Sequence, residues 1–195
     1  MKALVDNDFL NHLVGKKIPV NQPLEEVIKT IFDGLGAEAY IHELVKEHEL
    51  VLDTMPPRSR KVVISLFQKD YIKIAFLNKI LSTEAQKDYY IKMFMDIYYE
   101  FKGELPFEEK KILTEWRRGK SLGEVHSLTM CLVDNFGIFL SDDDDSRKLK
   151  AIIEDKFSVE IAVLDRRKAL DKVSELGNKK IERKVRRTLE SDKNN

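Results

Sequence analysis

The chain has 195 residues, of which 43% are hydrophobic, and this length and composition predict a single globular domain with its own core. Lys plus Arg and Asp plus Glu both number 34, so the net charge is zero and any binding of nucleic acid must depend on local basic patches. The single cysteine, Cys131, excludes an intrachain disulfide, and no apolar run approaches the ~18 residues of a membrane-spanning helix. We therefore expect a cytoplasmic protein that does not contact a membrane.

The first part of the chain predicts strands that alternate with helices. Residues 3–5 are an apolar run that ends at Asp6, which predicts a buried strand opening into a loop, and residues 9–14 predict a short helix. Residues 24–35 carry apolar side chains at three- and four-residue steps, the pattern of an amphipathic helix. Residues 39–41 predict a second strand with a helix after it, although periodicity alone does not separate strand from helix over so short a stretch.

The rest of the chain divides into a helical region and a second alternating region. Residues 53–119 predict a nearly all-helical elaboration, in which Thr83 and Gln86 have capping-box spacing. The elements expected after it are helix 122–133, strand 136–140, helix 147–156, strand 158–164 and helix 166–176. This alternation predicts a three-layer α/β/α fold with a mainly parallel sheet of four to five strands. We assign residues 1–177 to one domain and residues 178–195 to a basic C-terminal helix and tail.

Acidic residues follow two of the predicted strands. Asp6 comes directly after the first strand, and Asp142 follows the strand that ends at Leu140. Because ligand sites in parallel sheets lie beyond the carboxyl ends of the strands, we expect both acids at one edge. We expect Glu124 at the same edge. The helix that begins near Glu124 is roughly 16 Å long, and the strand after it runs about as far in the opposite direction, so Asp142 returns to the level of Glu124. Gathered carboxylates repel one another unless hard cations such as Mg²⁺ or Mn²⁺ hold them, and such ions activate water for phosphodiester hydrolysis.

Each acid also has a simpler explanation. Ser121 and Glu124 have capping-box spacing, so Glu124 could merely complete the start of a helix. The run Asp142–Asp145 could cap the helix that follows, where acids favour the helix dipole. Asp6 and Asp8 could be ordinary turn residues. The metal hypothesis therefore depends on the convergence of all these side chains in space.

The segments around the acids resemble the motifs of the PIN-domain nuclease family. Leu4–Leu10 resembles the first motif, a strand that ends in a metal-binding Asp with a small polar residue two positions later. Gly123-Glu124-Val125 resembles the family's Gly-Glu helix, whose acid faces the metals. Phe139–Asp143, with Arg147 on the following helix, resembles the next motif of strand, Ser and Asp. The likeness covers residues 1–50 and 120–175.

The resemblance implies a fold, an activity and a set of site residues. The implied metal ligands are Asp6, Glu124, Asp142 and Asp143, with Ser141 and Asp8 in support and Glu43 as a further catalytic acid. The four-Asp run leaves the register open by one residue, and we favour Asp142 and Asp143 over Asp144 and Asp145. PIN proteins are typically ribonucleases, and many are toxins of bacterial toxin–antitoxin pairs. The resemblance thus implies RNA cleavage with Mg²⁺ or Mn²⁺, and it leaves an antitoxin-type protein partner and a homodimer open.

Basic residues flank the proposed site in sequence. They are Arg117, Arg118, Lys120 and Arg147, and they could position phosphates. An ordinary solvated surface explains them as well.

Two other functions fit parts of the pattern. A strand ending in Asp6 and Asp8, with paired acids later, also resembles the haloacid-dehalogenase phosphatases, with Asp6 as nucleophile and Lys120 as the charge-balancing amine. Against this, Phe9 stands where that family has a small or branched residue, and Gly123-Glu124 stays unexplained. The non-enzymatic alternative is a PIN-like scaffold that binds RNA or protein without cleaving it.

Overall fold

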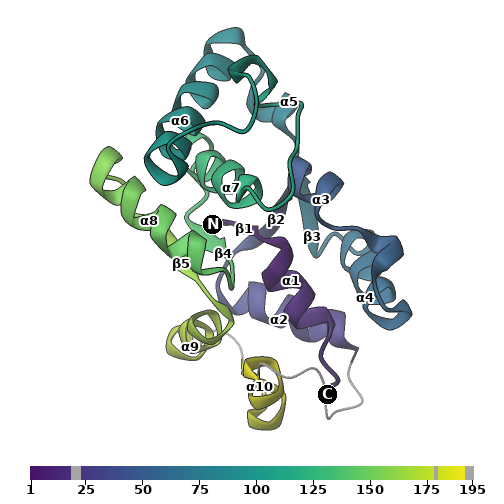
Figure 1. Ribbon diagram of the computed structural model, residues 1–195. Coiled ribbons are helices and arrows are strands. Elements are labelled where there is room, and N and C mark those ends of the chain that lie inside the picture. The colour runs from purple at the N-terminus through teal and green to yellow at the C-terminus, as the bar shows by residue number, and fades with distance from the viewer. Residues whose placement is uncertain (19–22, 178–179, 192–195) are drawn as a thin grey trace.

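The computed structural model describes residues 1–18, 23–177 and 180–191, and its centre is a five-stranded sheet (Figure 1). The strands are β1 (Lys2–Val5), β2 (Glu38–His42), β3 (Ile72–Ala75), β4 (Ile138–Leu140) and β5 (Ala162–Leu164). Their order is β3-β2-β1-β4-β5, and every pairing is parallel. Helices flank the sheet on both sides, so the predicted α/β/α fold class is confirmed.

Two hydrophobic cores fill the space between the sheet and its helices. One face of the sheet packs against α1 (Asn7–Val14), α2 (Leu24–Gly34), α4 (Pro57–Gln68), α9 (Arg166–Leu176) and α10 (Arg183–Glu190). The other face packs against α5 (Leu77–Ile80), α6 (Glu84–Lys102), α7 (Leu122–Val133) and α8 (Asp144–Phe157). Strand β1 contributes to both cores, because successive residues of a strand point to opposite faces. Ala3 and Val5 face the first core, and Leu4 faces the second.

The middle of the chain differs from the sequence prediction. Residues 53–119 were expected to be nearly all helical, but they contain β3, which extends the sheet beyond β2. This strand has only four residues, too few for a period to be recognised, and Lys73 lies on the edge strand, where charged side chains limit pairing with other chains. The capping box of α6 is confirmed, since Thr83 Oγ1 accepts from the Gln86 N–H at 3.2 Å and Gln86 Oε1 accepts from the Thr83 N–H at 3.0 Å.

The basic C-terminal segment forms a helix that packs on the domain. Val185 and Leu189 of α10 are buried in the first core, and Arg166 Nη1 donates to the carbonyl oxygens of Leu189 and Ser191, both at 3.2 Å. Residues 178–179 and 192–195 of the predicted tail lie outside the described residues. Among the helices described, none combines the length and the apolar character needed to cross a membrane.

Two short elements complete the surroundings of the site. Helix α3 (Glu43–His48) follows β2 directly, and the 3-10 turn η1 (Leu52–Thr54) follows α3. A long loop that contains the 3-10 turn η2 (Glu109–Lys111) runs from α6 to α7. The loop crosses one side of the sheet's carboxyl edge, so it can form a wall for a site there (Figure 1).

Candidate metal centre

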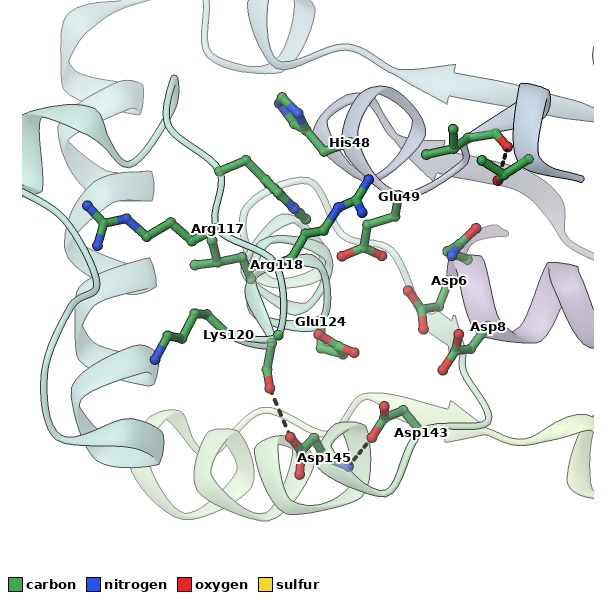
Figure 2. Close-up of a pocket in the computed structure, with 17 residues that line it drawn as sticks. Asp6, Asp8, His48, Glu49, Arg117, Arg118, Lys120, Glu124, Asp143 and Asp145 are labelled. Carbon is green, nitrogen blue, oxygen red and sulfur yellow. Dashed lines mark hydrogen bonds between the residues drawn. The ribbon is translucent and has the colours of Figure 1, made fainter.

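A cavity of about 650 Å³ lies at the carboxyl ends of β1 and β4 and the start of α7 (Figure 2). Six carboxylates line it, and they come from four separate segments of the chain. They are Asp6, Asp8, Glu49, Glu124, Asp143 and Asp145. The loop between α6 and α7 supplies the opposite wall through residues 116–120. Segments that are far apart in sequence therefore present one acidic cavity, as the sheet topology predicts.

Asp6 is the most deeply buried of these acids. Its backbone N–H donates to the Leu140 carbonyl at 2.8 Å, which continues the β1–β4 ladder by one residue and sets Asp6 beside Ser141. Ser141 Oγ donates to Asp6 Oδ2 at 3.1 Å, whereas Asp6 Oδ1 is buried and has no hydrogen-bond partner among the described residues. The residue is 2% exposed. Burial raises the pKa of Asp6 well above its usual range, and the charges of Glu124, Glu49 and Asp8 raise it further.

Glu49 is a site residue that the sequence analysis missed. It follows the last residue of α3, and its carboxylate rests against the first turn of α7 at Gly123. A Cβ atom at position 123 would lie 2.7 Å from Glu49 Oε1, so only glycine leaves room for this approach. Burial, followed by the charges of Glu124 and Asp8, raises the pKa of Glu49 to about 7. The signal in the sequence for this contact is Gly123, because a glycine in the first turn of a predicted helix indicates that another group packs closely against that turn.

Glu124 projects from the first turn of α7 into the same cavity. Its pKa is raised to about 7, chiefly by burial; its own backbone N–H lowers the pKa, and the charges of Asp143 and Asp8 raise it. The capping-box explanation of this residue is wrong, because Ser121 has a left-handed backbone (φ 53°) and caps no N–H of α7. Ser121 Oγ instead donates to Asp145 at 2.9 Å. Glu124 is therefore a half-buried acid that takes no part in a capping box with Ser121.

Asp143 combines a capping role with a place in the cavity. Its Oδ1 accepts from the Asp145 N–H at 2.7 Å at the start of α8, and its own N–H donates to Ser141 Oγ at 3.2 Å. The capping interpretation of the four-Asp run is thus correct for one of its members. Asp8, on the first turn of α1, has its pKa raised by burial and then by the charge of Asp143. Ser141 contacts both Asp6 and Asp143 and so holds the two residues next to each other.

The structure places Asp142, one of the two favoured ligands, outside the cavity. Its Oδ1 accepts from the Arg166 N–H at 3.0 Å, and its Oδ2 contacts both Arg166 Nε and, at 2.8 Å, His12 Nδ1. Successive residues of an extended segment point to opposite sides, so Ser141 and Asp143 face the acids while Asp142 faces α1 and α9. This alternation brings Asp143, and not Asp142, to the cavity.

Two other predicted residues also lie away from the cavity. Glu43 is the first residue of α3, and its carboxylate lies near the Leu77 N–H at the start of α5. Because Glu49 follows it by six positions, roughly 1.7 turns of helix, the two acids leave α3 on different sides. Arg147 pairs with Asp144 and, at 3.3 Å, with Asp165, so its guanidinium is held on the outer side of α8.

The wall opposite the acids carries basic and aromatic side chains. Arg117, Arg118 and Lys120 line the cavity, but only Arg118 extends toward the Glu49 side, whereas Arg117 and Lys120 point away from the acids (Figure 2). Trp116 stacks on His48, with ring centroids 5.0 Å apart and planes at 15°. On its other side Trp116 stacks at 6.0 Å on His126, which is buried in α7. These stacked rings fix the loop against α3 and α7.

The residues of the cavity fit a divalent cation by their chemistry. Within the part of the chain that the structure describes, no three His, Cys, Asp or Glu side chains are already arranged around one ion-sized point. The buried Asp6 Oδ1, however, is an acceptor to which no described residue donates, and the pKa of each of Asp6, Glu49 and Glu124 is raised by burial and by other carboxylates. A hard cation with oxygen ligands would supply the missing partner and remove the repulsion.

No family model, curated protein or solved structure matches this chain. The resemblance to the PIN-domain nucleases depends on the motifs and on the placement of the acids. Membership of that family, with its RNA substrate and its antitoxin-type partner, stays a prediction.

Proposed function

We propose that this protein is a metal-dependent nuclease that hydrolyses phosphodiester bonds in RNA, in the manner of the PIN-domain nucleases. The observation that carries the proposal is the buried Asp6 carboxylate in a cavity of acids: Ser141 holds one of its oxygens, and the other has no partner among the residues that the structure describes. Keeping such a group buried costs stability, and a bound cation offsets that cost. The proposed setting is the cytoplasm.

Four residues would hold Mg²⁺ or Mn²⁺ in this proposal: Asp6 through its free oxygen, together with Glu49, Glu124 and Asp143. When bound, such ions polarise the phosphate and lower the pKa of water that attacks it. The chain's own groups prepare the site. Ser141 orients Asp6 and Asp143 through its hydroxyl, and Gly123 lets the Glu49 carboxylate approach α7.

The basic wall would bind the substrate backbone. Arg118 lies across the cavity from the acids and is placed to contact a phosphate, as arginine does in nucleic-acid complexes. Trp116 holds this part of the loop through its stacking on His48 and His126. The phosphate would then lie between Arg118 and the acids, where a cation held by the acids can reach it.

The direct test is cleavage of single-stranded RNA with Mn²⁺ or Mg²⁺, with and without EDTA. We expect cleavage that requires the ion and is lost in Asp6→Asn, while Asp88→Asn, a matched change on the exposed side of α6, cleaves as the unsubstituted protein does. Cleavage that persists in EDTA or in Asp6→Asn would contradict the proposal.

Two alternatives give different results in the same assay. RNA binding without cleavage supports the scaffold alternative. Turnover of an aryl phosphate that beryllofluoride blocks supports the phosphatase, although Lys120, its charge-balancing amine, points away from Asp6 (Figure 2).

A further inference from the structure

A second cavity, of about 250 Å³, adjoins the metal centre. The two cavities share Glu49, Val51 and Thr54, so they meet at η1 and at the end of α3. The second cavity continues from there to the C-terminal end of α1 and the start of α4, and it is called the Asn11 pocket below. Its remaining lining residues are Asn11, Val14, Gly15, Met55, Pro56 and Ser59.

The Asn11 pocket differs from the metal centre in its chemistry. Among the residues that the structure describes, Glu49, which it shares with the first cavity, is the one charged group of its lining, and the rest of the lining includes both polar and apolar side chains. The hydroxyl of Thr54 donates to the Val51 carbonyl at 2.9 Å, and that of Ser59 donates to the Val14 carbonyl at 3.3 Å. These hydroxyls therefore have acceptor capacity left for a ligand.

Asn11 is the polar group best suited to recognise a ligand. Its side-chain amide has no hydrogen-bond partner in residues 1–18, 23–177 and 180–191, and the residue is half-buried on α1. A free amide presents a donor and an acceptor side by side. This pair matches the donor and acceptor atoms on the edge of a nucleobase.

We propose, on the basis of the nuclease function above, that the Asn11 pocket receives one nucleobase of a single-stranded substrate, next to the phosphate that is cut. Its volume is below the roughly 300–1,000 Å³ of sites for drug-sized ligands, so it suits a single ring system. A phosphate is disfavoured there, because the lining has no Lys, Arg or His and includes Glu49. A base in a duplex cannot turn into a side pocket without leaving its stack, so the substrate strand is unpaired at this position.

Binding can be measured without any cleavage, by NMR of the Asn11 side-chain amide during titration with AMP, CMP, GMP and UMP. Ribose 5-phosphate serves as a probe that lacks the base. We expect at least one nucleotide to shift the Asn11 amide signals, and ribose 5-phosphate to leave them unchanged. Equal shifts with ribose 5-phosphate, or no shift with any nucleotide, would overturn the proposal.

Asn11→Leu removes the hydrogen bonds of the amide and keeps the branching of the side chain, with a somewhat larger volume. A bidentate base contact contributes about 1–3 kcal/mol, so Asn11→Leu should weaken nucleotide binding by roughly fivefold or more. Asn78→Leu, the same change at an exposed position of α5, should leave the affinity unchanged. Equal affinity of Asn11→Leu and the unsubstituted protein would show that Asn11 does not read the base.

Cleavage assays distinguish failure of this proposal from failure of the nuclease function. With RNA that varies at the positions flanking the cut, Asn11→Leu should raise KM and lose base preference at one position, with kcat little changed. An unchanged base preference would overturn the Asn11 pocket while leaving the nuclease intact. Absence of cleavage by the unsubstituted protein would overturn the nuclease function, while the nucleotide titration still tests the pocket.

Discussion

Asp142 and Asp143 are neighbours in sequence, but they enter two different environments. Asp142 is matched by charge, since Arg166 and His12 contact its carboxylate in a separate cavity of about 400 Å³. Asp143 faces the acidic cavity, where burial and neighbouring carboxylates raise the pKa of Asp6, Glu49 and Glu124. Removing one partner of a buried ion pair destabilises the fold, whereas crowding of acids costs stability unless a bound cation offsets it.

Replacing Asp142 and Asp143 one at a time should give the largest effects, and it tests whether the two carboxylates differ in their contribution to stability. The side chains of Asp142 and Arg166 are each 9% exposed, so Asp142→Asn removes the charge of a buried carboxylate that pairs with the Arg166 guanidinium. We expect the free energy of unfolding to fall by about 3–5 kcal/mol, the usual result of breaking a buried ion pair. Asp143→Asn should keep nearly full stability, because asparagine also caps helices well.

For cation affinity we expect the reverse: the variant that keeps its stability, Asp143→Asn, should lose more affinity than Asp142→Asn. Asp143→Asn should weaken Mn²⁺ binding by about 10-fold or more, and Asp142→Asn should change it little. Urea denaturation in EDTA and Mn²⁺ titration of the folded proteins measure the two effects separately. Equal losses of Mn²⁺ affinity in both variants would remove the distinction between the two environments.

Glu43 and Glu49 give a second contrast, at the two ends of α3. Glu49 lines the acidic cavity and Glu43 does not, so Glu49→Gln should weaken Mn²⁺ binding by about 10-fold while Glu43→Gln leaves it unchanged. Calorimetric titration with Mn²⁺ measures both. A larger effect of Glu43→Gln on Mn²⁺ affinity would contradict this prediction, because it would mean that the side of α3 that carries Glu43 faces the cation.

Stability should depend on pH through the crowded acids. The pKa of Glu49 and of Glu124 is raised from 4.5 to about 7 in the folded protein, so the folded state binds protons more tightly than the unfolded state does. In EDTA, the free energy of unfolding should therefore fall as the pH rises from about 4.5 through about 7. Mn²⁺ should reverse the fall at pH 8, because it binds the ionised acids of the folded state alone.

A double variant, Glu49→Gln with Glu124→Gln, is the control for the remaining titratable groups. The unsubstituted protein should lose stability relative to this variant over the same pH range, measured by thermal melting at several pH values. A relative stability that rises with pH would mean that these acids have favourable partners.

Gly123→Ala should have the smallest effect. An added Cβ displaces the flexible end of Glu49 from 2.7 Å, so cation affinity should fall a few-fold. Helix propensity favours alanine by roughly 0.5–1 kcal/mol, so stability should not fall. In the Glu49→Gln background the same change should leave cation affinity unaltered, and a double-mutant cycle measures this coupling. An equal loss in both backgrounds would show that Gly123 acts independently of Glu49.

The sequence predicted the part of the fold that depends on hydrophobic patterning. β1 and β4 are apolar runs that end in acids, so their carboxyl ends, with Asp6 beside Ser141, could be placed at one edge of the sheet. Glu124 could be added by helix and strand lengths alone. β3 could not be predicted, because four residues next to a helix carry no recognisable period.

Two of the errors at the site, those over Glu43 and Asp142, have a common cause, since each depended on where an element begins. Helix α3 starts after His42, whose Nδ1 accepts from the Leu44 N–H at 3.1 Å, and histidine is not among the preferred caps. That start decides that Glu49 rather than Glu43 enters the cavity. Likewise, the alternation after β4 decides between Asp142 and Asp143, and one residue of register reverses the result.

The most direct test of the account is Mn²⁺ binding to the unsubstituted protein and to Asp6→Asn, followed by the EPR signal of the free ion at pH 8. The account predicts saturable binding to the unsubstituted protein and its loss in Asp6→Asn, while Asp88→Asn binds as the unsubstituted protein does. Unchanged binding in Asp6→Asn, or no binding to the unsubstituted protein, would contradict the claim that these acids form a cation site.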